Sequence, residues 1–212
     1  MWEYEKKALS KGYKQIAGID EAGRGPLAGP VVSAAVILPE DFSCPGITDS
    51  KKLSAKKRNE FFPLIKSQAV CVATGIASHQ EIDQINILRA SLLSMKRAVE
   101  NLSQSCDSVH SDFLLPDYLL IDGKFTLDMD IDQSAIVKGD SKSISIAAAS
   151  IIAKVTRDSI MKNLHEKYPL YNFIQHKGYP TKAHKEAILK HGPCPVHRQT
   201  FKGVKKDVND QC

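Results

Sequence analysis

The 212-residue sequence lacks most features that mark stapled, membrane-embedded or disordered chains. Its five cysteines are odd in number and no two have CxxC spacing, which argues against a zinc finger and a disulfide scaffold. The longest apolar runs, such as AAASIIA at 147–153, are far too short to span a membrane. Internal repeats and low-complexity linkers are also missing. A chain of this length can bury a core without staples, so we expect an ordinary folded protein.

The first twelve residues, MWEYEKKALSKG, are rich in charge and contain no apolar run. A secretory signal needs such a run, so none is expected here. Together with the scattered cysteines, this predicts a protein of a reducing compartment, the cytoplasm.

Positive charge is concentrated at one end of the sequence. The chain has a net charge of +5, from 29 basic and 24 acidic residues. Residues 177–212 contain eight basic and three acidic residues and therefore hold all of this excess. A neutral body with a basic end favours a polyanionic partner such as nucleic acid, because phosphate contacts release counterions. The alternative is a solvated end that only aids solubility.

Hydrophobic patterns predict an α/β fold. β-branched and apolar runs indicate strands, and longer amphipathic or Ala-rich segments indicate helices. The expected strands are 14–19, 31–38, 69–76, 117–122 and 135–137. The expected helices are 54–68, 82–102, 143–165 and 182–190, with a Pro-bearing loop at 168–181. This order predicts a mixed five-stranded sheet with a hairpin-like first half, flanked by helices and followed by a small, basic C-terminal helical part.

Acidic residues follow three of these strands. Asp20 and Glu21 come after the first, Asp122 ends the fourth, and Asp140 follows the fifth. Sites in open α/β sheets gather outside the carboxyl ends of strands, so parallel neighbours would bring these carboxylates together. Such a cluster repels itself unless a hard divalent cation such as Mg²⁺ binds its oxygens. Two such ions about 3.5–4 Å apart can support phosphodiester cleavage.

Each of these acids also has an ordinary structural explanation. Asp20 and Glu21 can be a polar strand end, and adjacent strand residues normally point to opposite faces. Asp122 precedes a glycine and can belong to a plain turn. Asp140 can cap the helix that follows it. Spacing alone therefore leaves both the metal site and these explanations open.

Five sequence blocks resemble the ribonuclease HII family, the type 2 ribonucleases H, in the same order. They are GIDEAGRGPLAGPVVSAAVIL (18–38), DSKKLS (49–54), LLIDGK (119–124), VKGDSKSISIAAASIIAKVTRD (137–158) and HKGYPTKAHKEAILKHGPCPVHRQTF (176–201). The resemblance covers about residues 14–203, nearly the whole chain. The first and fourth blocks are highly specific.

The resemblance implies a ribonuclease H-like fold and an endoribonuclease that depends on Mg²⁺ or Mn²⁺. The implied substrate is the RNA strand of an RNA–DNA hybrid, or a single ribonucleotide embedded in duplex DNA, as in ribonucleotide excision during DNA replication and repair. Cleavage 5′ to the ribonucleotide by two metal ions would leave 3′-hydroxyl and 5′-phosphate ends. We place the catalytic core at 14–168 and a basic substrate-binding part at 169–206. The implied metal ligands and catalytic residues are Asp20, Glu21, Asp122 and Asp140.

The same resemblance assigns residues that hold the substrate. The run Gly23-Arg24-Gly25 maps to the family's reader of the ribose 2′-hydroxyl, the group that separates RNA from DNA. Tyr179 maps to the aromatic side chain that stacks on the neighbouring deoxyribose. Contacts to the nucleic-acid backbone are expected from Ser50, Lys51 and Lys142.

Rival assignments exist for both function and site. Ribonuclease HIII is similar in fold and carboxylates, but that family carries an extra N-terminal domain and usually lacks the GRG run. A non-catalytic hybrid-binding protein could share the fold as well. Asp158 competes with Asp140, but it would lie roughly 22 Å along its helix, so Asp140 is preferred. We expect a monomer with no resident protein partner, and structural roles for the histidines and cysteines.

Overall fold

The computed structural model describes residues 1–105 and 116–204. Lys205 and Lys206 of the basic end, and also Cys106 and Cys212, lie outside the described residues. The strands are β1 (Ile16–Ala22), β2 (Val31–Ile37), β3 (Cys71–Ala77), β4 (Tyr118–Asp122) and β5 (Asp132–Ile136). They form one five-stranded sheet in the order β3-β2-β1-β4-β5.

Antiparallel and parallel pairing meet at β1, the central strand. β2 runs antiparallel to both β1 and β3, whereas β4 pairs in parallel with both β1 and β5. Residues 23–30 join β1 to β2, residues 38–70 join β2 to β3 and include a helix, and residues 123–131 join β4 to β5. The predicted mixed five-stranded sheet with a hairpin-like first half is confirmed. As a consequence, β1, β4 and β5 present their carboxyl ends at the same end of the sheet.

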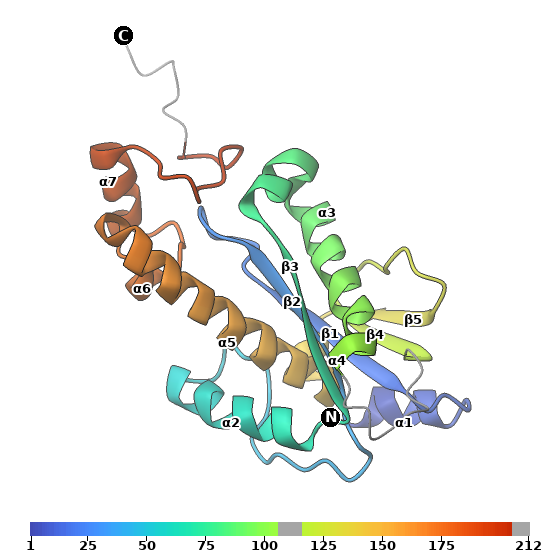
Figure 1. Ribbon diagram of the computed structural model, residues 1–212. Coiled ribbons are helices and arrows are strands. Elements are labelled where there is room, and N and C mark those ends of the chain that lie inside the picture. The colour runs from blue at the N-terminus through green and yellow to red at the C-terminus, as the bar shows by residue number, and fades with distance from the viewer. Residues whose placement is uncertain (106–115, 205–212) are drawn as a thin grey trace.

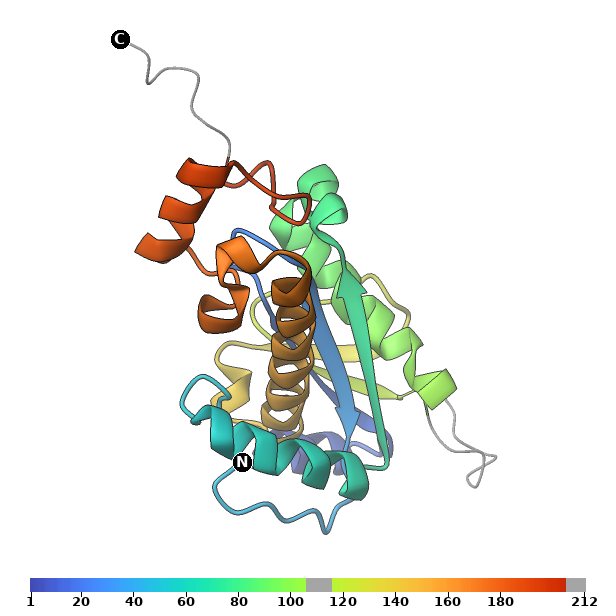
Figure 2. The same ribbon diagram turned by 60° about the vertical axis from the view of Figure 1, so that its left-hand side comes forward.

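Helices cover both faces of the sheet (Figure 1). α3 (His79–Glu100) packs on one face, and α5 (Ile144–Lys167) crosses the other with α2 (Ala55–Gln68) beside it. The shorter elements are α1 (Glu3–Leu9), α4 (Leu102–Ser105), the 3-10 turns η1 (Gly139–Ser141) and η2 (Pro169–Tyr171), α6 (Phe173–His176) and α7 (Lys182–His191). The turned view shows α6 and α7 gathered at the far end of α5 (Figure 2). None of the described helices has the length and apolar character needed to cross a membrane.

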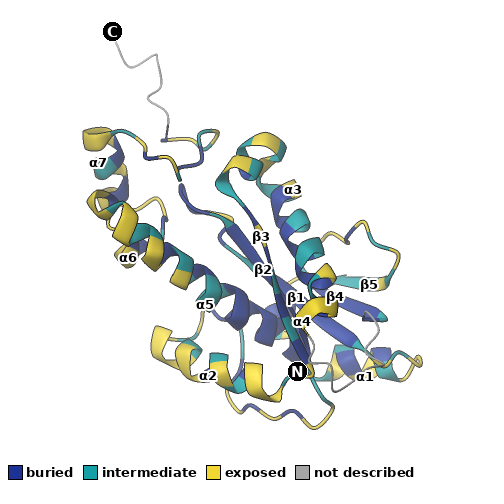
Figure 3. Cartoon of the chain, viewed as in Figure 1, coloured by how far each residue is buried: buried dark blue, intermediate teal, exposed yellow. Residues whose placement is uncertain are grey.

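Burial follows from this layering. All seven residues of β2 are buried, because both faces of the strand are covered. Ala34 and Val36 pack in the cluster beneath α5, while Ala35 and Ile37 pack in the cluster beneath α3. β1, β2, β4 and the first half of α5 form most of the dark core of Figure 3, whereas the outer sides of α2 and α7 are exposed. β2 is accordingly apolar at every position except Ser33, whose hydroxyl bonds that of Ser94.

The start of α5 lies very close to β1. Ser143 caps the helix by accepting the Ile146 N–H. Oε1 of the buried Glu5 accepts hydrogen bonds from the Ser143 hydroxyl and from the Ser145 N–H, an amide of the first turn of α5. A methyl group at Gly18 would lie 2.1 Å from the Ser145 carbonyl carbon, so only glycine allows this approach.

Several boundaries differ from the sequence prediction. β1 continues through Ala22 instead of ending before Asp20, because it stays paired with β2 along that length. The helix expected from residue 82 begins at His79, inside a capping box. β5 begins at Asp132, three residues early. Helix α1 is not predicted, and the expected loop 168–181 contains the short helices η2 and α6.

The C-terminal part packs directly on the rest of the chain. A β-bridge joins Ala28 to His197, and His197 and His184 are buried with their Nε2 atoms 3.0 Å apart. The apolar cluster that holds this part together contains Leu27, Ala28, Met161, Tyr171, Phe173, Ile188, Cys194 and Val204. Up to residue 204, the basic end is therefore a folded part of the molecule.

Candidate active site

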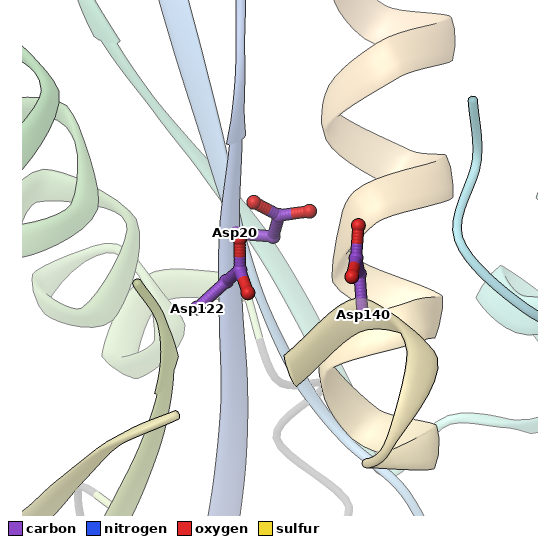
Figure 4. Close-up of side chains that lie close together, drawn as sticks. All are labelled: Asp20, Asp122 and Asp140. Carbon is purple, nitrogen blue, oxygen red and sulfur yellow. The ribbon is translucent and has the colours of Figure 1, made fainter. Parts of the chain in front are cut away.

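Three carboxylates meet at the carboxyl end of the parallel strands (Figure 4). Asp20 comes from β1, Asp122 ends β4, and Asp140 lies in the turn η1 after β5. One oxygen from each lies within 4.8 Å of the others. The structure thus brings together three of the four carboxylates that the sequence predicts to converge.

Backbone geometry explains how each carboxylate reaches this point. Asp20 is in register with Ala34, which lies on the α5 side of the sheet. Asp122 Oδ1 accepts the Gly139 N–H at 2.7 Å, so Asp122 holds the turn that carries Asp140. Asp140 therefore lies over the same face as Asp20, and it does not cap α5, because a serine takes that position.

Burial and mutual repulsion disfavour the charged forms of these carboxylates. Burial, followed by the charges of Glu21 and Asp122, raises the pKa of Asp20 well above its usual value. Burial and the charge of Asp122 likewise raise the pKa of Asp140 to about 6. Full ionisation of the cluster is therefore unfavourable, and a bound cation would relieve it.

Glu21 lies beside this triad but is not part of it. The register pairs it with Ser33, whose hydroxyl bonds Ser94 of α3, so strand alternation assigns Glu21 to the other face. Its carboxylate pairs with Arg24 at 3.4 Å. Burial raises the pKa of Glu21 to about 7, against the lowering effect of the Arg24 charge. A role for Glu21 in metal binding stays a prediction.

A lysine and a further carboxylate flank the triad. Burial alone would lower the pKa of Lys51, but the charges of Asp20 and Asp140 raise it overall. After burial and Asp122, Asp49 adds to the raised pKa of Asp140, and its Oδ1 accepts the Lys51 N–H at 2.8 Å. The Lys51 ammonium thus balances part of the negative charge of the site.

The donor set fits a hard divalent cation. Every ligand atom that the triad offers is a carboxylate oxygen, the donor type that Mg²⁺ and Mn²⁺ prefer. Among the described residues no histidine or cysteine joins this cluster, so zinc is a poor match. Dependence on a divalent metal follows, with Asp20, Asp122 and Asp140 as the residues that would hold it.

Three of the predicted substrate-reading residues, Arg24, Gly25 and Tyr179, are exposed beyond β1. Gly23 is buried, whereas Arg24 and Gly25 are exposed. A methyl group at Gly25 would lie 3.7 Å from the ring of Tyr179, a residue that is 40% exposed. Lys154 Nζ lies 5.9 Å from the centre of the same ring. An aromatic side chain and an exposed loop thus adjoin at the surface.

Three other residues named by the sequence analysis have different surroundings. The Ser50 hydroxyl is buried and accepts a hydrogen bond from the Ser150 hydroxyl at 2.6 Å. Lys142 Nζ donates to a main-chain carbonyl between β5 and η1 at 2.8 Å. Asp158 forms an ion pair with Lys154 at 2.8 Å and is not among the clustered carboxylates. This agrees with the prediction that Asp140, and not Asp158, joins the cluster.

Sequence reasoning misses two buried arginines. Arg157 and Arg198 are fully buried, and no carboxylate among the described residues forms an ion pair with either. Both donate to main-chain carbonyls of the loop 23–30. They lie in family-like blocks, but only the fold shows what they contact.

Comparisons with known proteins agree with this geometry. The family model described as Ribonuclease HII matches residues 17–204. A Ribonuclease HII from Geobacter sulfurreducens is 50% identical over 210 residues, which cover 99% of this chain and 92% of that protein. The ribonuclease H2 structure from Pyrococcus horikoshii OT3 has a TM-score of 0.65 at 25% identity, covering 90% of this chain and 95% of that one. The structure of the PCNA:RNase HII complex from Archaeoglobus fulgidus has a TM-score of 0.70 at 25% identity, covering 93% of this chain and all of the matched one.

A carboxylate triad at the end of this mixed sheet defines a metal-dependent ribonuclease, a hydrolase of phosphodiester bonds. The ribonuclease H-like fold implied by the sequence blocks is confirmed. The chain belongs to the ribonuclease HII family, as both the family model and its relatives show. It therefore has ribonuclease H endonuclease activity on RNA–DNA hybrids, and assignment to ribonuclease HIII is not supported.

Metal binding is expected to stabilise the protein more at higher pH. The pKa of Asp140 is about 6 and that of Glu21 about 7 in the folded chain, against about 4 in an unfolded chain. Between about pH 4 and 7, the metal-free folded state binds more protons than the unfolded state, so its free energy of unfolding falls as pH rises. A cation displaces those protons and offsets the loss. Mg²⁺ should therefore raise Tm more at about pH 8 than at about pH 5, and an equal rise would contradict the site.

Proposed function

We propose that the protein also incises duplex DNA on the 5′ side of a single embedded ribonucleotide, leaving 3′-hydroxyl and 5′-phosphate ends. The observation that supports this proposal is the exposed segment Arg24–Gly25, which begins two residues after the end of the strand that bears Asp20. A ribose reader so close to the carboxylates would select the phosphodiester next to a ribonucleotide. One 2′-hydroxyl would then be enough for recognition.

The proposed catalytic residues are the four carboxylates. Two ions of Mg²⁺ or Mn²⁺ would activate a water and stabilise the leaving 3′ oxygen. Asp20 is the proposed ligand of both ions, because it is buried and its charge couples to those of Asp122 and Glu21. Asp122 would also keep the turn with Asp140 in place through its hydrogen bond to Gly139. The set comprises Asp20, Glu21, Asp122 and Asp140.

The proposed substrate contacts surround this site. Gly23, Arg24 and Gly25 would read the 2′-hydroxyl, and the exposed ring of Tyr179 would stack on the neighbouring deoxyribose. Lys51 would hold the phosphate near the triad. The carboxylate charges of the triad already favour the ammonium form of Lys51. Lys142 is likewise a proposed contact to the nucleic-acid backbone near the cut. Because its hydroxyl is buried, Ser50 would act by fixing the segment that carries Lys51.

Cleavage of a duplex that contains one ribonucleotide tests this function. We expect a single cut on its 5′ side that requires Mg²⁺ or Mn²⁺, and no cut in the matched all-DNA duplex. The variant Asp20→Asn serves as the inactive control. Cleavage restricted to duplexes with several consecutive ribonucleotides would reject single-ribonucleotide incision, and binding without any metal-dependent cleavage would indicate a non-catalytic protein.

The remaining proposals concern the working form of the molecule. We propose a catalytic core at 14–168 with a substrate-binding part at 169–206, acting as a cytoplasmic monomer without a resident protein partner. The basic residues of α7, such as Lys182, Lys185 and Lys190, support nucleic-acid binding by this part. The Archaeoglobus relative was solved with PCNA, a statement about that protein alone. A measured mass of one chain in solution, with and without a hybrid duplex, tests the monomer.

A further inference from the structure

Arg198 lies fully buried beneath the loop that joins β1 to β2. Its backbone N–H donates to the Leu27 carbonyl at 2.8 Å, so the main chain here is already tied to the loop. Its guanidinium then donates at 2.6–3.2 Å to four further carbonyls, those of Gly23, Arg24, Gly29 and Pro30. One side chain therefore holds both the start and the end of the loop.

These carbonyls are what solvates the Arg198 charge. Among the described residues no carboxylate pairs with Arg198, and the ring of Phe201 lies 5.0 Å from its Cζ. Burial, and then the charge of Arg157, lower the pKa of Arg198 to about 9, so it still carries its charge at neutral pH. A buried cation is costly unless dipoles surround it. If the loop moved and any one carbonyl lost its hydrogen bond to Arg198, the buried charge would be less well solvated and the free energy of the folded state would rise. The loop is therefore held in one conformation.

The direction of two carbonyls also fixes the direction of two amides. In a trans peptide the C=O and the next N–H point in opposite directions, and no described peptide bond is cis. Arg198 Nη2 donates to the Gly23 carbonyl at 2.6 Å, and Nη1 donates to the Arg24 carbonyl at 3.0 Å. The N–H groups of Arg24 and Gly25 must therefore point away from the buried guanidinium.

Those two N–H groups are free to bind a ligand. Neither the Arg24 N–H nor the Gly25 N–H has a hydrogen-bond acceptor among the described residues, and both residues are exposed. Two successive N–H groups that point the same way form a site for an oxygen atom with free lone pairs. The Gly23 and Arg24 carbonyls already accept from Arg198, so at these two peptides the loop offers the sugar N–H donors.

We propose that Arg198 is a positioning residue for ribose selection, which turns the Arg24 and Gly25 amides outward to donate to a ribose 2′-oxygen. This role rests on the proposed function, in which the loop reads the 2′-hydroxyl. Lysine cannot replace Arg198, because a single ammonium group lacks the planar fork that reaches four carbonyls at once. The arginine is therefore required for the shape of the loop as well as for its charge.

Arg157 provides a matched control on the same loop. It is equally buried and donates to the carbonyls of Ala28, Pro30 and Lys177, but to neither Gly23 nor Arg24. Replacing either arginine with lysine removes a buried fork and should lower Tm. Only Arg198→Lys frees the two carbonyls that orient the outward amides.

The experiment compares the affinity of the wild-type protein, Arg198→Lys and Arg157→Lys for two duplexes, without added metal. The duplexes differ in one position, which is a ribonucleotide in one and a deoxyribonucleotide in the other, and the readout is the ratio of the two Kd values. Loss of folded protein weakens both affinities equally and leaves the ratio unchanged. We expect the ratio to fall about tenfold or more in Arg198→Lys, the effect of about one well-formed hydrogen bond to a substrate hydroxyl. Arg157→Lys should keep the wild-type ratio.

The outcomes separate this inference from the function beneath it. If the wild-type protein binds both duplexes equally, the proposal that the loop recognises the ribose is wrong, and the proposed role of Arg198 is wrong as well. If the wild-type protein discriminates and Arg198→Lys discriminates as well, only the role of Arg198 is wrong. An equal loss of discrimination in both variants would also overturn it, because any damage to the loop would then suffice.

A second measurement needs no variant, so it holds even if Arg198→Lys does not fold. In the NMR spectrum of the wild-type protein, the amide protons of Arg24 and Gly25 should move downfield with the ribonucleotide duplex relative to the all-DNA duplex. Amide protons that stay in place would show that these groups do not donate to the ribose, against the proposal.

Discussion

Replacing Asp122 with asparagine is expected to lower kcat for hybrid cleavage by about 10³-fold or more. The change removes one negative charge from the triad and with it part of the attraction for a divalent cation, an effect worth several kcal/mol in the transition state. Asparagine can still accept the Gly139 N–H that Asp122 accepts at 2.7 Å, so the turn with Asp140 should stay in place. Single-turnover cleavage in excess Mg²⁺ measures the loss.

Two controls make the Asp122→Asn result specific. Affinity for the hybrid should change little, because the substitution does not touch the loop or the basic helix that we expect to bind it. Asp158→Asn removes a carboxylate that pairs with Lys154 at 2.8 Å outside the triad, and its kcat should stay close to that of the wild-type protein. Full activity of Asp122→Asn, or an equal loss in Asp158→Asn, would refute the assignment of the triad.

Replacing Gly18 with alanine is expected to destabilise the fold and the site together. The added methyl group would lie 2.1 Å from the Ser145 carbonyl carbon, so the start of α5 must move away from β1. Such overpacking against backbone costs about 3 kcal/mol, which corresponds to a fall in Tm of roughly 6–12 °C for a chain of this size. Because η1 and Asp140 immediately precede α5, kcat should fall as well.

Gly75 on β3 offers a matched control for this prediction. A methyl group there would lie 2.1 Å from the Ser94 carbonyl oxygen of α3, on the opposite face of the sheet from α5. Gly75→Ala should therefore lower Tm by a similar amount while kcat per folded molecule stays near the wild-type value. Thermal unfolding combined with active-site titration separates the two effects. Equal kcat in both variants would show that the contact at Gly18 does not position the site.

The sequence predicts the parts of this molecule that depend on local pattern. The apolar, β-branched run at 31–38 predicts a strand covered on both faces, and the helices expected from residues 54 and 143 do begin there, directly after Ser54 and Ser143. Convergence of Asp20, Asp122 and Asp140 is predictable once their strands are taken as parallel neighbours. Segments with a weak hydrophobic pattern are not predicted correctly. An example is α1, a short charged segment without a strong helical pattern.

What the sequence cannot show is where a side chain goes once distant segments meet. Arg157 and Arg198 resemble surface arginines in the sequence, because burial without a carboxylate partner has no local signature. Glu21 is a different case: the sequence predicts a role shared with Asp20, the regular pairing of β1 alternates the two side chains between faces, and a part for Glu21 in metal binding stays a prediction. Asp49 escapes notice because its approach to Asp140 depends on a loop whose path has no repeating pattern.

The order of the strands has a consequence for the synthesis of the chain. β1, β2 and β3 are consecutive strands and can pair once residue 77 has left the ribosome, whereas β1 must wait about a hundred residues for β4. Asp122, Asp140 and Arg198 all arrive after that delay. A nascent chain can therefore build three of its five strands before Asp122, Asp140 and Arg198 are made, so under the proposed site assignment we expect cleavage only when translation is nearly finished.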